Sequence, residues 1–391
     1  MQILMLTHNA ALHGGTYWRA FPLARALAAN GHEVTLIPSR RDVGCRCRQA
    51  ERDGVEVVES PDLLPRRLRH GGLSPVDLAW RYHFVRNRTF DIVHSFSHRP
   101  AAFAAALHLK RQGVPLVLDW SDLYGPPGIA STRPKLSRLL LGRLDAFLEK
   151  KALLKADLIT AICGPLAQRA RSVGVLPGKV ALLPVGANTR DIQVRDRSQA
   201  RLQIGIPEDA SVIVHTGYAW YDDELLAATV KDICRQRPEV LFLFAGRPRD
   251  KIAGLVRQEK NGGAVKDLGM IPFSKMSLVL ACADVALLPY RNSTVNRYRY
   301  PNRLGDYMAA GLPVVINDTA DAGELVRRRG IGVATSDSSK EMSRAVVDLL
   351  GKPEVRRDMG ARALALAQGE LSWDTLGAHL EELYSAVVSA G

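Results

Sequence analysis

Residues 301–315 combine side chains that can bind a charged ligand. Asn302 and Asp306 are four residues apart and share one face of a helix, with Arg303 in its first turn. The N–H groups at a helix start and a guanidinium attract phosphate, while a carboxylate one turn later accepts hydrogen bonds from hydroxyls. This arrangement suits a sugar nucleotide. The alternative is a surface helix in which Arg303 and Asp306 pair with each other.

The same segment indicates where this helix begins and ends. Pro301 favours the first helical position, Gly311 favours the residue just past the end, and Pro313 prevents continuation. Leu304 and Met308 would occupy the apolar side. We therefore predict a short helix that packs through one side and presents a polar side.

Several glycines follow predicted strands, at the sheet edge where open α/β folds bind ligands. Gly217 ends one predicted strand, and Gly246 followed by Arg247 ends the next. Gly14 and Gly15 lie between the first strand and a helix, where backbone without side chains lets a phosphate approach closely. Two glycines are equally typical of a turn, and the dinucleotide pattern G-x-G-x-x-G does not occur.

Short apolar runs alternate with amphipathic segments, which is typical of parallel sheets covered on both faces. The predicted strands of the first half are Gln2–Leu6, Glu33–Ile37, Val55–Val58, Ile92–Ser95, Leu116–Asp119, Leu158–Ala161 and Val180–Leu183. Those of the second half are Val212–Thr216, Leu241–Ala245, Ala264–Leu268, Val285–Pro289, Val314–Asn317 and Gly332–Ala334. Helices are expected between them, and the polar stretch Asn188–Gln203 suits a linker. We predict an α/β protein with two tandem Rossmann-like domains, residues 1–187 and 188–371.

Composition places the chain among globular proteins. Its 391 residues allow two domains, and 47% hydrophobic with 24% charged residues exclude disorder. The net charge of +13 favours an anionic partner, but no zinc-finger spacing, RNP-like segment or Arg-rich arm indicates nucleic acid. Residues 65–90 and residues 133–155 each carry a net charge of +5. Both segments suit a phosphorylated substrate or an anionic membrane surface.

The cysteines and the N-terminus indicate the compartment. Five cysteines, an odd number, give no disulfide framework and favour a reducing environment. Cys45 and Cys47 could bind a metal, but they lack a second pair or a nearby His. The N-terminus does not read as a signal peptide, and no apolar run reaches the roughly 18 residues of a membrane span. We expect a cytoplasmic protein.

The helix at residues 301–315 resembles the signature helix of the GT-B glycosyltransferases, in particular the large retaining family 4. The family pattern is Pro-x-Lys-x-x-Glu-(Tyr/Ala)-Met-Ala-x-Gly-x-Pro-Val-Val, in which Arg303 stands at the Lys and Asp306 at the Glu. The resemblance extends over nearly the whole chain and includes a Ser-Trp motif at Trp373. It implies a GT-B architecture in which a C-terminal helix, residues 372–391, crosses back to the first domain.

The resemblance also implies which residues act. Those that would bind the nucleotide-sugar donor are Gly15, Gly217, Arg247, Met270, Ile271, Asn302, Arg303 and Asp306. His98 matches the family histidine that contacts the transferred sugar, although an isolated histidine at a strand end is more often structural. Asp119 and Asp122 end a strand and are candidates for acceptor contacts.

The implied reaction moves a sugar from a nucleotide diphosphate sugar to an acceptor hydroxyl with retention. The departing phosphate oxygen can accept the hydroxyl proton, so no enzymic base is required. No Asp-x-Asp triplet occurs, so we expect no metal and no cofactor, with basic residues and helix dipoles neutralising the diphosphate. The two basic segments lead to the hypothesis of a lipid-linked or membrane-associated acceptor, with the protein peripheral on the inner face of the membrane.

The chain departs from the family at the phosphate-binding positions. Many members have an Arg and a Lys after the glycine equivalent to Gly217, where this chain continues with Tyr218. The first Glu of the family's Glu-x7-Glu motif would fall at Tyr298. Arginines in residues 290–300, together with Arg303, could replace these groups. The departures leave two alternatives open, a non-catalytic GT-B-like partner subunit and a GT-B sugar-nucleotide epimerase.

Overall fold

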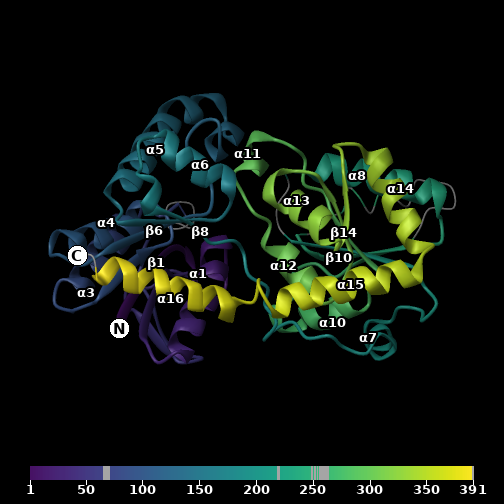
Figure 1. Cartoon of the computed structure of the whole chain (residues 1–391), viewed down its shortest axis with the longest axis horizontal. Coiled ribbons are helices and arrows are strands. Elements are labelled where there is room, and N and C mark those ends of the chain that lie inside the picture. The colour runs from purple at the N-terminus through teal and green to yellow at the C-terminus, as the bar shows by residue number, and fades with distance from the viewer. Residues whose placement is uncertain are drawn as a thin grey trace. The chain divides into compact units, whose positions relative to one another are not determined.

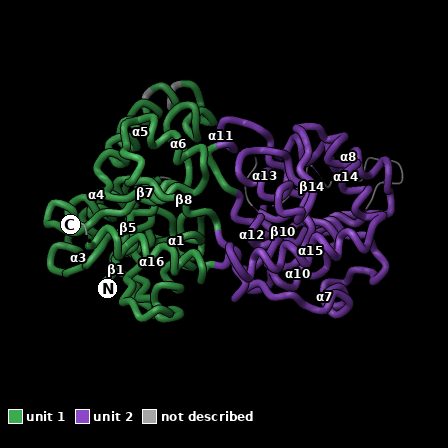
Figure 2. The backbone as a smooth tube through the Cα atoms, viewed as in Figure 1, with its two compact units in different colours: residues 1–185, 298–300, 373–391 green, residues 186–297, 301–372 purple. Residues whose placement is uncertain are grey.

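A computed structural model describes residues 1–64, 71–217, 221–247, 250, 252, 254 and 264–389. The chain divides into two compact units, shown in different colours in Figure 2. Unit 1 comprises Met1–Val185, Tyr298–Tyr300 and Trp373–Gly391, and unit 2 comprises Gly186–Arg297 and Pro301–Ser372. Each unit contains its own largely parallel sheet with helices, so the predicted α/β fold with two Rossmann-like domains is confirmed.

The sheet of unit 1 has the strand order β3-β4-β2-β1-β5-β6-β7-β8 among the described residues. Its strands are β1 (Gln2–Ala10), β2 (Glu33–Ser39), β3 (Arg48–Arg52), β4 (Val55–Glu59), β5 (Ile92–Ser95), β6 (Leu116–Trp120), β7 (Leu158–Ala161) and β8 (Val180–Leu182). All neighbouring strands are parallel except β3, which pairs antiparallel with β4. Every residue of β5, β6 and β7 is buried, so both faces of the sheet are covered.

Helices of unit 1 connect these strands, except α16, which is the last element of the chain (Figure 1). They are α1 (Gly15–Ala29), α3 (Pro75–Val85), α4 (Pro100–Arg111), α5 (Lys135–Lys155), α6 (Gly164–Ser172) and α16 (Trp373–Ser389), with 3-10 turns η1 (Ile129–Thr132) and η2 (Pro177–Lys179). Helix α16 packs closely on α1, because a Cβ added to Gly377 would lie 2.4 Å from the Cβ of Ala26. The Tyr384 hydroxyl of α16 lies 2.6 Å from His94 Nδ1 on β5. The predicted return of the C-terminal helix to the first domain is therefore confirmed.

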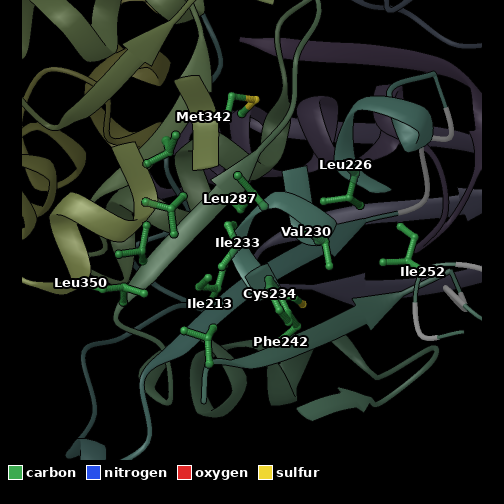
Figure 3. Close-up of a cluster of buried hydrophobic side chains, with 14 of the residues drawn as sticks. Ile213, Leu226, Val230, Ile233, Cys234, Phe242, Ile252, Leu287, Met342 and Leu350 are labelled. Carbon is green, nitrogen blue, oxygen red and sulfur yellow. The ribbon is translucent and has the colours of Figure 1, made fainter. Parts of the chain in front are cut away.

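The sheet of unit 2 is entirely parallel among the described residues, with the order β11-β10-β9-β12-β13-β14. Its strands are β9 (Val212–Gly217), β10 (Leu241–Gly246), β11 (Ala264–Asp267), β12 (Val285–Leu288), β13 (Val314–Asn317) and β14 (Gly332–Thr335). Figure 3 shows the apolar core on one face of this sheet. It joins strand residues such as Phe242 and Leu287 to Val230 of α8 and Met342 of α14.

The helices of unit 2 include one that the sequence analysis assigned to a linker. They are α7 (Arg197–Ile204), α8 (Asp223–Gln236), α10 (Met276–Ala281), α11 (Thr294–Arg297), α12 (Asn302–Ala309), α13 (Ala320–Arg329), α14 (Ser339–Leu350) and α15 (Pro353–Gln368), with the 3-10 turn η3 (Phe273–Lys275). The predicted linker is wrong in its second half. Arg201 of α7 is buried and pairs with Asp284 at 3.0 Å, so a long-range ion pair holds this polar helix in place.

Candidate active site

Helix α12 ends as the sequence predicts, but it begins one residue later, because Pro301 is its N-cap with extended backbone and not its first helical residue. Gly311 follows it with φ +66°, a left-handed conformation that suits glycine. The N–H of Gly311 donates to Met308 O at 3.0 Å, and the N–H of Leu312 donates to Tyr307 O at 3.0 Å. These two bonds form a Schellman C-cap. Leu304 and Met308 are fully buried, while Asn302, Arg303 and Asp306 on the polar side are half-buried.

Arg303 is anchored at the carboxyl end of β9. Its Nη1 donates to Thr216 O at 2.6 Å and lies 3.2 Å from His215 Nε2. His215 Nδ1 lies 2.9 Å from the carbonyl oxygen of Leu287, which can only accept, so Nδ1 carries the proton and Nε2 accepts from Arg303. A Cβ at Gly217, where φ is +115°, would lie only 3.2 Å from Arg303 Nη1. Glycine therefore gives the guanidinium room at this strand end.

Asp306 does not form the alternative pair with Arg303. Its Oδ1 accepts a hydrogen bond from Asn188 Nδ2 at 3.0 Å. Burial raises the pKa of the Asp306 carboxyl to about 7, and the Asn188 hydrogen bond only partly opposes this shift. The charge of Asp191 raises that pKa further. Both protonation states of Asp306 are therefore accessible near neutral pH.

The other predicted donor residues of unit 2 follow adjacent strands of one sheet. The N–H of Gly246 donates to Gly269 O at 2.7 Å, and the N–H of Arg247 donates to Gly217 O at 3.2 Å. The Arg247 side chain is exposed and lies 4.0 Å from Asp223. Met270, which is 54% exposed, and the half-buried Ile271 follow β11. The structure thus brings the four predicted positions Gly217, Arg247, Met270 and Ile271 to the sheet edge at which Arg303 is anchored. The departure at residues 218–220 lies outside the described residues.

The predicted arginine cluster of residues 290–300 is divided between the units. Arg299 belongs to unit 1, where its Nε lies 3.1 Å from Asp122. Arg297 Nε donates to Asn292 Oδ1 at 2.7 Å. Replacement of the family's phosphate-binding pair stays a prediction, and Arg303 is the arginine whose position at a strand end supports it.

In unit 1, Gly15 begins helix α1. The N-cap residue Gly14 has no side chain to accept a hydrogen bond from the first turn, and Asn9 supplies the acceptor instead. Asn9 Oδ1 accepts from Thr16 N at 2.9 Å and from Thr16 Oγ1 at 2.8 Å. A Cβ at Gly14 would clash with Asn9 at 2.5 Å, so Gly14 is required by packing. A Cβ at Gly15 would meet no described atom within 4 Å. Packing therefore does not explain Gly15, and a role in donor binding stays a prediction.

His98 lies between β5 and the start of α4 and is buried. Its ring packs edge-on against Tyr124, with centroids 4.9 Å apart. Its Nε2 has no hydrogen-bond partner among the described residues. Burial, helped by the charge of Arg99, holds the pKa of the His98 imidazole well below its usual range. His98 is thus a neutral, buried group with one ring nitrogen that has no described partner, and its role at the sugar stays a prediction.

His8, near the carboxyl end of β1, is a candidate that the sequence analysis missed. It is buried, its Nε2 lies 3.4 Å from the Tyr124 hydroxyl, and its Nδ1 has no partner in the described part of the chain. Burial is the main reason that the pKa of His8 is lowered to about 3. The Arg99 guanidinium covers the Tyr124 ring at 4.4 Å. The rule that ligands bind at strand ends would have selected His8, because β1 and β5 are neighbours.

Asp119 and Asp122 have different environments. Asp119 is buried, pairs with Arg19 at 2.8 Å, and accepts from the Thr160 hydroxyl at 2.9 Å. Its carboxylate is therefore committed to the interior of unit 1, which gives Asp119 a structural role. Asp122 is half-buried, and burial raises the pKa of its carboxyl although Arg299 opposes the shift. An acceptor contact stays a prediction, and exposure favours Asp122.

No group of His, Cys, Asp and Glu that could hold a metal ion is found within the described residues. Cys45 and Cys47 are exposed free thiols. A metal-independent reaction stays a prediction from the sequence.

Two family models match the chain. Residues 14–186 match the glycosyl transferase 4-like domain, and residues 210–352 match glycosyl transferases group 1. A D-inositol 3-phosphate glycosyltransferase 2 of Catenulispora acidiphila is 24% identical over 422 aligned residues, which cover 98% of this chain and 94% of that protein. A GDP-mannose-dependent monoacylated alpha-(1-6)-phosphatidylinositol monomannoside mannosyltransferase of Corynebacterium glutamicum is 28% identical over 200 residues. That second match covers 48% of this chain and only 50% of the relative.

A solved structure agrees with the family models. Sucrose-phosphate synthase from Thermosynechococcus elongatus aligns over 100% of both chains with a TM-score of 0.80 and 17% sequence identity. At this identity the likeness concerns the fold alone, and the fold is GT-B. Together with the two family models and the signature helix, it shows that the chain belongs to the family 4-like GT-B glycosyltransferases, enzymes that transfer a sugar from a nucleotide-sugar donor.

Proposed function

We propose that this protein transfers a sugar from a nucleoside diphosphate sugar to an acceptor hydroxyl, with retention at the anomeric carbon and without a metal ion. The observation that carries the proposal is the position of Arg303. Thr216 and His215 hold its guanidinium at the carboxyl end of β9. Arg303 and Asp306 belong to the same helix, α12. A guanidinium at such a strand end suits a diphosphate, and a carboxylate one turn later suits ribose hydroxyls.

In the proposed reaction, the bond between the anomeric carbon and the diphosphate oxygen breaks. A bond to the acceptor oxygen forms on the same face of the sugar, and the departing phosphate oxygen takes the acceptor proton. Arg303 and the backbone N–H groups of helix starts stabilise the negative charge that develops on the diphosphate. His98 is proposed to orient the sugar through its unpartnered Nε2, because a neutral imidazole can bind a hydroxyl without adding charge.

We propose a membrane-associated acceptor and a cytoplasmic location. The Corynebacterium relative is named for a phosphatidylinositol mannoside acceptor, which supports a lipid-linked substrate here. All five cysteines are free thiols, which supports a reducing compartment. None of the helices in the described part of the chain has the length and hydropathy to cross a bilayer.

The test is a panel of UDP-, GDP- and dTDP-sugars incubated with a lipid or polyol acceptor. We expect nucleoside diphosphate release with one donor class, unchanged by EDTA, and an anomeric configuration by NMR that matches the donor. Inversion would exclude the retaining mechanism, and loss of activity in EDTA would exclude metal independence. Interconversion of donors without acceptor would indicate an epimerase. Failure to bind or turn over any donor would indicate a non-catalytic partner subunit.

A further inference from the structure

The solvent-facing side of α5 is unusual for a helix of a folded domain. Four large apolar side chains on it are between 48% and 60% exposed: Leu139, Leu144, Phe147 and Leu154. Single exposed apolar residues are common, but a cluster on one element indicates an interaction surface. The cluster requires a partner that accepts apolar groups.

Basic residues are interleaved with these apolar ones. Along the helix, Leu139, Arg143, Phe147, Lys150 and Leu154 follow one another at intervals of three or four residues and are all exposed. This spacing places them in one stripe along the helix. Lys151 lies beside the stripe, with its Nζ 4.4 Å from the centroid of the Phe147 ring. Apolar and positively charged groups are therefore presented together.

The acidic residues of α5 face the opposite way. Asp145 and Glu149 are 3% and 4% exposed. Asp145 accepts from Arg99 at 2.8 Å, and Glu149 accepts from Trp120 Nε1 at 2.8 Å. The exposed charges of α5 are all positive: Lys135, Arg138, Arg143, Lys150, Lys151 and Lys155. The surface of this helix is thus more positive than its sequence composition indicates.

The other basic segment, residues 65–90, offers a smaller surface of this kind among its described residues. Arg81 of α3 is completely buried and pairs with Asp77 at 2.5 Å. Arg66, Arg67 and Arg69 lie outside the described residues. The exposed basic residues in the described part of this segment are Arg86 and Arg88, and its exposed large apolar residues are Leu73 and Tyr82. Of the two segments that the sequence pointed to, α5 therefore has the larger described surface with both apolar and basic groups.

We propose that Leu139, Arg143, Leu144, Phe147, Lys150, Lys151 and Leu154, here named the α5 surface, dock this protein onto an anionic lipid bilayer. Lysine and arginine next to phenylalanine and leucine match the boundary between phosphate headgroups and acyl chains. A purely acidic protein partner would not require the exposed Phe147 and leucines. The inference rests on the proposed function in one respect, that the acceptor is membrane-associated.

The test is co-sedimentation of the full chain with vesicles of phosphatidylcholine containing phosphatidylglycerol, compared with phosphatidylcholine alone. We expect binding only to the anionic vesicles, weakened by high salt. Arg143→Gln with Lys150→Gln and Lys151→Gln should lower the partition coefficient by about a hundredfold, since each basic residue contributes roughly fivefold. Phe147→Ser with Leu154→Ser should lower it by about tenfold at unchanged charge.

The matched control removes three charges from unit 2, as Arg327→Gln, Arg328→Gln and Arg329→Gln on α13. Its net charge equals that of the α5 triple variant, and glutamine keeps helix propensity in both. We expect the control to bind anionic vesicles like the unchanged protein. An equal loss of vesicle binding in both triple variants would show that only the net charge of the protein matters, and it would overturn the proposal. So would absence of vesicle binding at low salt.

Two further measurements separate the alternatives. Light scattering without lipid reports self-association, and a dimer that Phe147→Ser with Leu154→Ser dissociates would assign the α5 surface to a second copy and overturn the proposal. Nucleoside diphosphate release from a soluble donor should be unchanged in the α5 variants. Turnover of a donor without vesicle binding would support the proposed sugar transfer and contradict membrane docking. Vesicle binding through α5 without turnover of any donor would support membrane docking and contradict the proposed sugar transfer.

Discussion

The two units hold their candidate binding groups in opposite ways. In unit 2, the Arg303 guanidinium is anchored by Thr216, and His215 uses both ring nitrogens in hydrogen bonds. In unit 1, His98 Nε2 and His8 Nδ1 are buried without a partner among the described residues. A buried polar atom without a partner costs about 1–3 kcal/mol. Unit 2 is thus preorganised for a charged group, whereas unit 1 carries a cost that ligand hydroxyls would remove.

The difference indicates how the two kinds of group should respond to mutation. A buried group whose hydrogen bonds are satisfied within the protein contributes to folding. A buried group left unsatisfied contributes little to folding, and a ligand is one partner that could satisfy it.

The largest effect is expected for a satisfied group in unit 1. Asp119→Asn leaves the buried Arg19 without its counter-ion and should lower the free energy of unfolding by about 3–5 kcal/mol. Urea denaturation measures this. The control is Asp122→Asn, where the pair with Arg299 is a quarter exposed and should matter by less than about 1 kcal/mol. Equal stability of the two variants would contradict the structural role of Asp119.

His98→Ala tests the unsatisfied group. We expect kcat to fall by about 100-fold because the sugar loses its orientation, while nucleoside diphosphate affinity stays the same. Its unfolding free energy should change far less than that of Asp119→Asn. His98→Gln controls for the space that alanine leaves. Turnover within about twofold of the unchanged protein would mean that His98 is only structural.

The anchor of Arg303 in unit 2 gives the next effect. Arg303→Ala should weaken nucleoside diphosphate binding by about 1–3 kcal/mol and nucleoside binding less, because the guanidinium acts on phosphate. His215→Ala should reproduce about 1 kcal/mol of this loss. His215→Gln, which keeps an acceptor near the position of Nε2, should restore most of it. Calorimetric titration with nucleoside diphosphate and with nucleoside measures both affinities. Equal losses of affinity for the two ligands would show that Arg303 does not bind the phosphate groups.

The smallest effect concerns the pH dependence of Asp306. With a pKa of about 7, its carboxylate form is lost below neutral pH, so donor affinity should fall about tenfold between pH 8 and pH 6. The same raised pKa means that the folded state binds the proton more tightly than the unfolded state. Stability should therefore decrease as pH rises from about 4 to about 7.

Asp306→Asn is the control for both pH effects, since it removes the titrating group and leaves the titration of the ligand's own phosphate. Its donor affinity should change less with pH than that of the unchanged protein. A pH dependence identical in both proteins would show that Asp306 does not contact the donor.

Local features could be predicted from the sequence. The C-terminal end of α12 follows from Gly311 and Pro313, because backbone preferences of single residues end a helix whatever surrounds it. The buried parallel strands were found because a strand covered on both faces must be a continuous apolar run. Strand β3 was not predicted, because it is not a continuous apolar run. Its residues are exposed and polar, and its pairing with β4 holds it in the sheet.

By itself, the sequence determined which residues share an element and which elements end at a binding edge. Only the tertiary structure decided what each group does there. Asp119 finds Arg19 one hundred residues away, His215 orients Arg303 from another strand, and α5 turns its acids inward and its cations outward. Spacing along the chain sets only which residues are local neighbours. Burial, protonation and anchoring depend on partners that folding brings together, so packing rather than spacing settled them.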